Sequence, residues 1–152
     1  MGESNKSNSL DIIPIDIPTT PLDLISEEAT DKIIKISWSP PQSDNGSPIT
    51  GYKVYLIQGF NLKELAETSD LEYTFTVTEI GLTYEFKVSA INKVGGSPLT
   101  APIQILAAIA PLAPSNFEVT EVSDKKISIS WQESTYNGGA PILDYTLYYQ
   151  IG

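Results

Sequence analysis

The sequence contains no cysteine, no histidine and no arginine. Without cysteine, no disulfide can cross-link the fold and no thiolate can act as a nucleophile or a metal ligand. Without histidine, the chain lacks the usual general base of a hydrolytic triad and the commonest nitrogen ligand of metal ions. These absences exclude a hydrolytic triad and thiol catalysis before any motif is considered.

The charge balance is acidic, and its basic part is lysine alone. Nine lysines stand against 19 acidic residues, which gives a formal net charge of −10 at pH 7. Nucleic acids and anionic membranes are bound by clustered cations, so neither is an expected partner. No apolar run approaches the roughly 18 residues of a membrane-spanning helix, and the first ten residues are too polar for a signal peptide. The missing cysteine and arginine favour an intracellular setting, cytoskeletal or ciliary, over the alternative of the cell surface.

What the chain does contain is an internal repeat. Residues 31–59 and 124–152 align in register without a gap, and every equivalent pair lies 93 positions apart. Trp38, for example, returns as Trp131 in the same sequence context. A fixed period of this size indicates a tandem array of whole domains.

Apolar and polar residues alternate with a period of two throughout each unit. The alternation is clearest in four stretches, residues 34–38, 52–57, 73–77 and 84–90. It is typical of strands with one face in a core and one in solvent. Clusters of Pro, Gly, Asn and Asp separate these stretches, and the less regular residues 62–69 are predicted as a short edge strand. Closely spaced strands without helices predict an all-β antiparallel sandwich.

Several motifs resemble those of a known family. They comprise an opening Pro-Pro-Leu pattern, a core tryptophan, the turn after it, and a late strand with its closing glycines: Pro18, Pro21, Leu24, Trp38, 40–52, 84–92 and 95–98. In these features the chain resembles the fibronectin type III domain, although Thr78 stands where that family usually has Leu. The resemblance implies an immunoglobulin-like antiparallel sandwich of seven strands, arranged in a tandem array.

The 93-residue offset divides the chain into three parts. Residues 18–110 are expected to form a complete domain, and residues 1–17 the last strand of a preceding domain or an N-terminal tail. Residues 111–152 are expected to supply the first three strands of a second domain. Alone, these strands would leave an apolar face and open edges. We expect their completion by missing residues of a longer parent chain or by another chain; the remaining alternative is disorder.

Four aromatic residues are predicted to be structural rather than functional. Each lies on the apolar side of an alternating stretch, where a sandwich places its core: Trp38, Tyr52, Tyr84 and Trp131. An exposed tryptophan can anchor a partner, but at the end of an alternating strand a core position is favoured.

Contacts with partners are expected in two loops, because loops on a rigid sandwich often carry function. The loops are residues 41–49 and 92–98, and the candidate contact residues are Asp44, Asn45, Ser47, Lys93, Val94 and Ser97. The alternative is that both loops are simple connections. Asn5 and Asn45 match the acceptor pattern for N-glycosylation, but Asn45 fits a turn equally well.

No catalytic, cofactor-binding or metal-binding residue is predicted. Asp44 could begin a calcium loop, but no acids follow it at alternate positions. The acid pairs Glu27 with Glu28 and Glu64 with Glu67 fall in stretches that imply no pocket. The Arg-Gly-Asp tripeptide that some fibronectin type III proteins use for adhesion is excluded, since the chain has no arginine.

The predicted function is that of a non-catalytic scaffold or protein-interaction module within a longer, elongated tandem-repeat protein. Its expected partners are other proteins, including neighbouring domains of the same parent chain. The alternative is a ligand-recognition ectodomain of a cell-surface receptor or adhesion protein that uses the loops 41–49 and 92–98.

Overall fold

The structure is a computed structural model, and it describes residues 14–151. The described residues form β-strands and loops, without a helix. In chain order the strands are β1 (Leu22–Ala29), β2 (Ile33–Ser39), β3 (Gly51–Gln58), β4 (Asn61–Thr68), β5 (Glu72–Thr76), β6 (Thr83–Ile91), β7 (Ile103–Leu106), β8 (Ser115–Ser123) and β9 (Lys126–Gln132).

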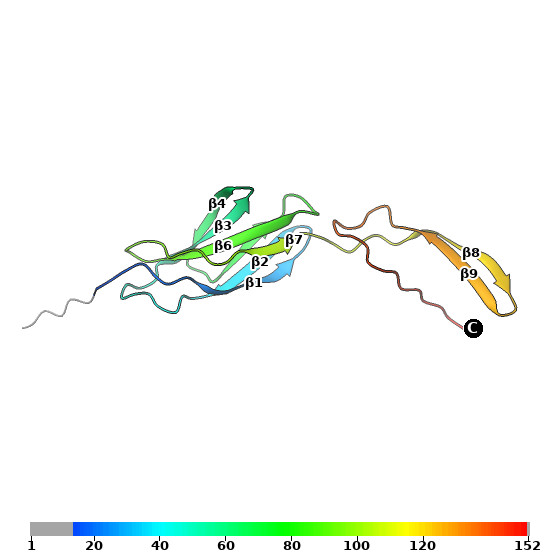
Figure 1. Cartoon of the computed structure of the whole chain (residues 1–152), viewed down its shortest axis with the longest axis horizontal. Helices are drawn as coiled ribbons and strands as arrows, with labels where there is room; N and C mark the ends of the chain where they lie inside the picture. Colours follow the sequence, from blue (N-terminus) through cyan, green and yellow to red (C-terminus); the bar gives the residue numbers. More distant parts are fainter. Residues whose placement is uncertain (1–13, 152) are drawn as a thin grey trace, which may run out of the picture.

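The first seven strands form a sandwich of two antiparallel sheets, which we call the complete unit. One sheet has the order β1-β2-β5 and the other β4-β3-β6-β7. The two sheets lie face to face, as Figure 1 shows. The predicted fold class is therefore confirmed, and β4 is the edge strand predicted at residues 62–69.

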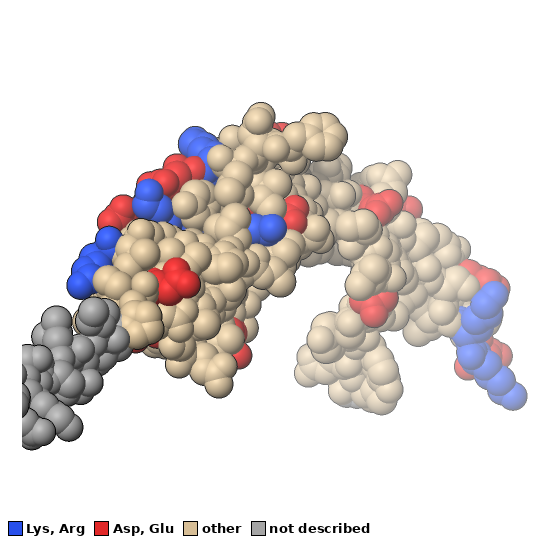
Figure 2. All heavy atoms as spheres, turned by 60° about the vertical axis from the view of Figure 1, so that its left-hand side comes forward, with Lys and Arg blue, Asp and Glu red and all other residues tan. Residues whose placement is uncertain are grey.

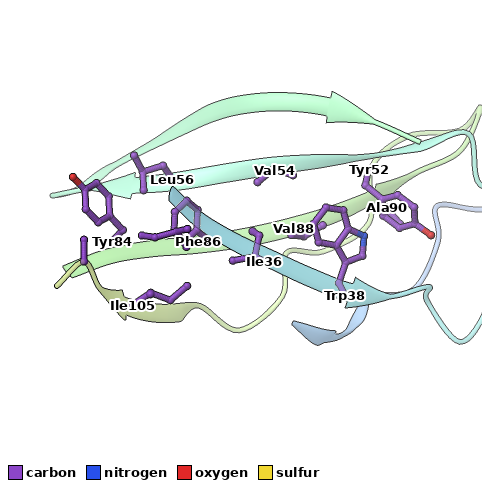
Figure 3. Packing of buried hydrophobic residues seen from close by; sticks show 12 residues of the cluster. Ile36, Trp38, Tyr52, Val54, Leu56, Tyr84, Phe86, Val88, Ala90 and Ile105 are labelled. Carbon is purple, nitrogen blue, oxygen red and sulfur yellow. The ribbon is translucent and has the colours of Figure 1, made fainter. Parts of the chain in front are cut away.

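The core of the complete unit lies between the two sheets (Figure 3). The alternating residues of β2, β3 and β6 point inward, and Ile36, Val54 and Phe86 have no exposed surface. Trp38 packs edge-on against Tyr52, with ring centroids 5.7 Å apart and an interplanar angle of 61°. Burial of such apolar side chains stabilises the fold by roughly 1.5–3 kcal/mol each.

Strands β8 and β9 form a separate antiparallel hairpin, which together with residues 133–151 we call the partial unit. The hairpin repeats the geometry of β1 and β2. Asp23 and Asn116, 93 residues apart, both have left-handed backbone angles, with φ of 52° and 50°. The ring pair Trp131 and Tyr145 also repeats the first pair, with centroids 5.7 Å apart at 62°. The sequence repeat is therefore a structural repeat as well.

The partial unit differs from the sequence prediction in two respects. Of the three expected strands only two are formed, because residues 133–151 contain no strand. In the complete unit, the equivalent strand β3 pairs with β4 and β6, and these partners have no counterpart among the described residues of the partial unit. Trp131, predicted as a core residue, is 37% exposed, since no second sheet faces it among the described residues.

The two units are joined by an extended segment, residues 107–114, and lie along the long axis of the molecule (Figure 1). The strand predicted within residues 1–17 falls almost wholly outside the described range. Residues 14–21 precede β1 and form no strand.

Candidate functional site

The two predicted contact loops lie at the same end of the sandwich, which we call the upstream end because the chain enters it there. Asn92 holds them together from a buried position at 3% exposure. Its amide nitrogen donates to the carbonyl oxygens of Asp16 (2.7 Å), Asp44 (3.1 Å) and Ser47 (3.3 Å). Its side-chain oxygen accepts from the backbone N–H groups of Val94 and Gly95. The loops therefore form one surface around a buried amide.

The predicted contact residues divide into exposed and buried ones. Asp44, Lys93 and Val94 are exposed and can meet a partner. Asn45 is half-buried, has a left-handed φ of 51°, and donates from its side chain to the carbonyl of Ile17 (2.7 Å). Its amide therefore helps to fix the segment that enters the sandwich.

Ser47 and Ser97, also predicted as contact residues, are 1% and 8% exposed. Burial removes them from any contact surface. The Ser97 hydroxyl accepts from the backbone N–H of Ala90 (3.0 Å) and donates to the carbonyl of Pro98 (2.8 Å), which ties the loop to β6. The Ser47 hydroxyl has no hydrogen-bond partner among the described residues. Both serines thus belong to the packing of the loops.

The opposite end of the sandwich, the downstream end, is organised around Tyr84. Its side chain is 7% exposed, and its hydroxyl accepts from the backbone N–H of Glu79 (2.9 Å) and donates to the carbonyl of the same residue (3.0 Å). The hydroxyl also lies 3.1 Å from Oγ1 of Thr78. The Thr at this position, where a Leu is usual in the resembled family, thus adds a polar contact to the corner.

Sequence reasoning missed two residues that shape these surfaces. Asn92 was not singled out, because the residues beside it in the sequence do not show that the end of β6 is buried against the loop of residues 41–49. Phe60 lies in the tight turn between β3 and β4 and is fully exposed. Gly59, with a φ of 61°, signals this turn but not the direction of the aromatic side chain.

Charged side chains of both signs are interspersed on the side of the sandwich that Figure 2 shows. Lys53 on β3 forms ion pairs with Glu64 (3.1 Å) and Glu67 (3.9 Å) on β4. The hydrogen bond to Glu64 and its negative charge raise the pKa of Lys53 above its ordinary value. These pairs are exposed and contribute little to stability, but they place charges along the edge strand, which discourages pairing with another sheet.

A hollow of about 540 Å³ lies on the partial unit and is mostly apolar in its lining, which includes Pro111, Phe117, Trp131 and Tyr145. In the complete unit, the equivalents of Trp131 and Tyr145 are Trp38 and Tyr52, which are buried core residues. The hollow is therefore the open half of a core.

Within residues 14–151, no three acidic side chains gather closely enough to hold a metal ion. The same residues include no helix that is long and apolar enough to cross a membrane.

A sandwich of three and four antiparallel strands with loops at both ends, whose first hairpin returns 93 residues later, defines an immunoglobulin-like β-sandwich module. The family model that matches is the fibronectin type III domain, over residues 18–106. The chain belongs to this family. The family resemblance drawn from the sequence is confirmed, and the match ends at the last residue of β7.

The similar proteins are large and diverse. Tyrosine-protein phosphatase Lar of Drosophila melanogaster is 32% identical over 120 residues, covering 75% of this chain and 6% of that protein. Human slow-type myosin-binding protein C is 28% identical over 153 residues, covering 97% of this chain and 13% of that protein. The chain therefore spans only a small part of the relatives it matches.

Solved structures agree on the fold. The twitchin kinase region from C. elegans is 29% identical with a TM-score of 0.57, covering 60% of this chain and 17% of that one. A structure of titin kinase and its flanking domains is 25% identical with a TM-score of 0.57, covering 60% of this chain and 17% of that one. Fibronectin type III domains are generally non-catalytic modules that mediate protein interactions, and they occur in tandem in such relatives. A phosphatase and a kinase among the parent proteins say nothing of catalysis in this segment.

Proposed function

We propose that this chain is a non-catalytic segment of a longer, elongated tandem array, and that the array acts as a scaffold for other proteins. The observation that carries the proposal is the repetition of structure at the 93-residue period. The left-handed bulge of β1 returns in β8, and the Trp38 and Tyr52 ring pair returns with the same geometry in the next unit. Such repetition is characteristic of proteins in which each unit contacts only its neighbours.

The arrangement of the strands supports an extended array. The chain enters the complete unit before β1 at the upstream end and leaves after β7 at the downstream end, since Leu106 lies opposite Thr83 at the start of β6. Successive units therefore add length. Pro111 and Pro114 restrict the segment that joins them.

The absence of histidine and cysteine from the sequence supports a non-catalytic role. The exposed residues of the upstream loops, Asp44, Lys93 and Val94, surround hydrogen bonds that serve the fold itself. Neither loop presents a nucleophile beside a base, which is the minimum for covalent catalysis.

Small-angle X-ray scattering on the full chain tests the elongated arrangement. We expect the scattering of a rod-like particle, with a pair-distance distribution that has a long tail beyond the diameter of one sandwich. A distribution with the single symmetric peak of a compact particle would contradict the proposal, because it would place the partial unit against the side of the complete unit.

The alternative role, recognition by the upstream loops, is favoured by one observation, the exposure of Lys93 and Val94 on a loop that Asn92 fixes from below. A double substitution of Lys93 and Val94 by Ala separates the two roles. In a recognition module it abolishes binding of protein partners, whereas in a scaffold that binds through strand edges it leaves binding unchanged. The reciprocal variant is Lys63→Ala with Leu62→Ala on the edge strand β4, which should weaken binding through that edge and leave recognition by the upstream loops unchanged.

A further inference from the structure

The contact between the two units is made by two turns that both contain glycine. The turn of residues 79–82, which we call the downstream turn, precedes β6 at the downstream end of the complete unit. Residues 137–140 of the partial unit form the other turn, and the Cα of Gly139 lies 3.4 Å from an ideal Cβ position built on Gly81. A Cβ on Gly139 would in turn lie 2.7 Å from Cγ2 of Ile80 and 2.8 Å from the backbone nitrogen of Gly81. Only glycine at position 139 permits this approach.

The connecting segment is hydrogen-bonded to both turns. On the side of the complete unit, the N–H of Gly81 donates to the carbonyl of Ala107 (2.7 Å), and the N–H of Ala107 donates to the carbonyl of Leu82 (3.0 Å). On the side of the partial unit, the N–H of Ile109 donates to the carbonyl of Gly138 (2.8 Å). Ala107 is completely buried. The junction is therefore a bonded structure rather than a free tether.

The partial unit's half of this junction exists a second time, at the upstream end of the complete unit. The equivalent of residues 137–140 is the turn of residues 44–47, which we call the upstream turn. Two pairs of hydrogen bonds recur at the 93-residue offset. The N–H of Ile109 donates to the carbonyl of Gly138 (2.8 Å), as the N–H of Asp16 does to the carbonyl of Asn45 (3.0 Å). Likewise, the N–H of Leu112 donates to the carbonyl of Tyr136 (3.1 Å), as the N–H of Thr19 does to the carbonyl of Ser43 (3.0 Å).

The turns themselves are also alike. Gly139 and Gly46 have left-handed φ angles of 88° and 78°. The backbone N–H of each glycine donates to the side-chain oxygen of the residue two positions before it, Gly139 to Asn137 and Gly46 to Asp44, both at 3.0 Å. The upstream turn is thus built in the conformation that contacts a downstream turn elsewhere in the same molecule, and Asp44 and Gly46 are exposed.

We propose that the upstream turn is a docking surface for the downstream turn of a preceding unit of the same kind, so that each unit of the array carries both halves of one repeated contact. The inference rests on the proposed tandem array and adds to it a fixed junction. The two turns lie at opposite ends of β6, which at about 3.3 Å per residue separates them by roughly 30 Å. Contacts at opposite ends join units head to tail without closing a dimer.

One sequence difference distinguishes the two junctions. The equivalent of Ala107 is Pro14, which has no N–H and cannot make the bond that Ala107 donates to Leu82. The Pro14 carbonyl can still accept a hydrogen bond equivalent to the one that the N–H of Gly81 donates to the carbonyl of Ala107. The turn contact therefore contributes a larger share of the docking at a junction that contains Pro14.

The test uses residues 14–152 extended at their N-terminus by a second copy of residues 14–106, joined directly to Pro14 so that the 93-residue period and the Pro14 junction are kept. Lys32, which is exposed, is replaced by Cys in each of the two complete units and labelled with a nitroxide; the natural chain has no other cysteine. We expect one narrow distance distribution, centred on the separation of positions 32 and 125 in the present structure. A broad distribution overturns the proposal.

Two variants locate the contact. In the second complete unit, Gly46→Val should remove the narrow peak, whereas Gly59→Val should keep it. Both glycines have left-handed φ angles, 78° and 61°, but a Cβ on Gly59 meets no atom within 4 Å.

A third variant, Ile80→Asp in the first unit, disrupts the contact from the other side. If the melting temperature shows that Gly46→Val has unfolded its unit, the distance distribution of Ile80→Asp tests the docking instead. A narrow peak that survives both Gly46→Val and Ile80→Asp overturns the proposal. Rod-like scattering of the natural chain together with a broad peak in the extended chain would refute the docking alone and leave the tandem array intact.

Discussion

At the scale of the residue, the complete unit tolerates two buried polar atoms without hydrogen-bond partners among the described residues, Trp38 Nε1 and Ser47 Oγ. In the unfolded chain such a group forms a hydrogen bond to water, so its burial without a partner costs free energy. The equivalent of Ser47 in the partial unit is Ala140. The array thus already contains the apolar alternative at this position.

Ser47→Ala should therefore stabilise the complete unit, by about 1 kcal/mol, because it removes an unsatisfied buried hydroxyl. The free energy of unfolding in urea measures the effect. The matched control is Ser43→Ala, which should destabilise, since the Ser43 hydroxyl donates to the Asn45 side chain (2.8 Å) and accepts the Asn45 N–H (3.0 Å). A loss of stability in Ser47→Ala would show that its hydroxyl is satisfied in solution.

Tyr52 predicts how stability depends on alkaline pH. Burial raises the pKa of Tyr52 above its ordinary value of 10.0, so the unfolded chain releases this proton at a lower pH than the folded one. The contribution of Tyr52 to stability is fully present below pH 10 and is lost as the pH rises through the raised pKa. Tyr52→Phe should flatten the decline of unfolding free energy above pH 10, whereas Tyr149→Phe, at a position 85% exposed, should not. Parallel declines in the parent protein and Tyr52→Phe would contradict this expectation.

At the scale of the element, the strands were predictable where burial follows a simple alternation. On β2, Ile34, Ile36 and Trp38 alternate with polar residues, and each faces the core of the sandwich. The loops were not predictable in the same way, because the burial of Ser47 and Ser97 depends on which loop lies against which. The third strand predicted for residues 111–152 is absent for a related reason: its alternation is present in the sequence, but a strand requires a partner.

Asn92→Ala should show how far the upstream loops depend on one side chain. The substitution leaves the carbonyls of Asp16, Asp44 and Ser47 without the amide donor, and we expect a loss of at least about 2 kcal/mol. Asn61→Ala, at an exposed position of β4, should change stability by less than about 0.5 kcal/mol. Amide hydrogen exchange of Val94 and Gly95 should accelerate in Asn92→Ala alone. Unchanged exchange at these two amides would contradict the role of Asn92.

At the scale of the whole molecule, the two units have the same pattern of core residues but only one has a closed core. Trp38 is 4% exposed and Trp131 is 37% exposed, although each packs edge-on against the corresponding tyrosine, Tyr52 or Tyr145, with the same geometry. Identical local structure therefore coexists with very different burial. The stability of the described chain must reside almost entirely in the complete unit.

The two tryptophans provide the corresponding measurement. Trp38→Ala should cost about 3–5 kcal/mol, as expected for a large aromatic residue in a closed core, and should abolish the main unfolding transition or shift it far to lower urea. Trp131→Ala should leave that transition in place. Circular dichroism follows both variants without relying on tryptophan fluorescence. Equal losses in the two variants would mean that the partial unit is closed in solution.

The position of the two chain ends on the complete unit has a mechanical consequence. The chain enters at the start of β1, where Leu22 lies opposite Ser39, and leaves at the end of β7, where Leu106 lies opposite Thr83 at the other end of the sandwich. A force applied through neighbouring units therefore runs parallel to the strands. It loads the hydrogen bonds between β1 and β2 in shear, so that they resist together instead of opening one after another.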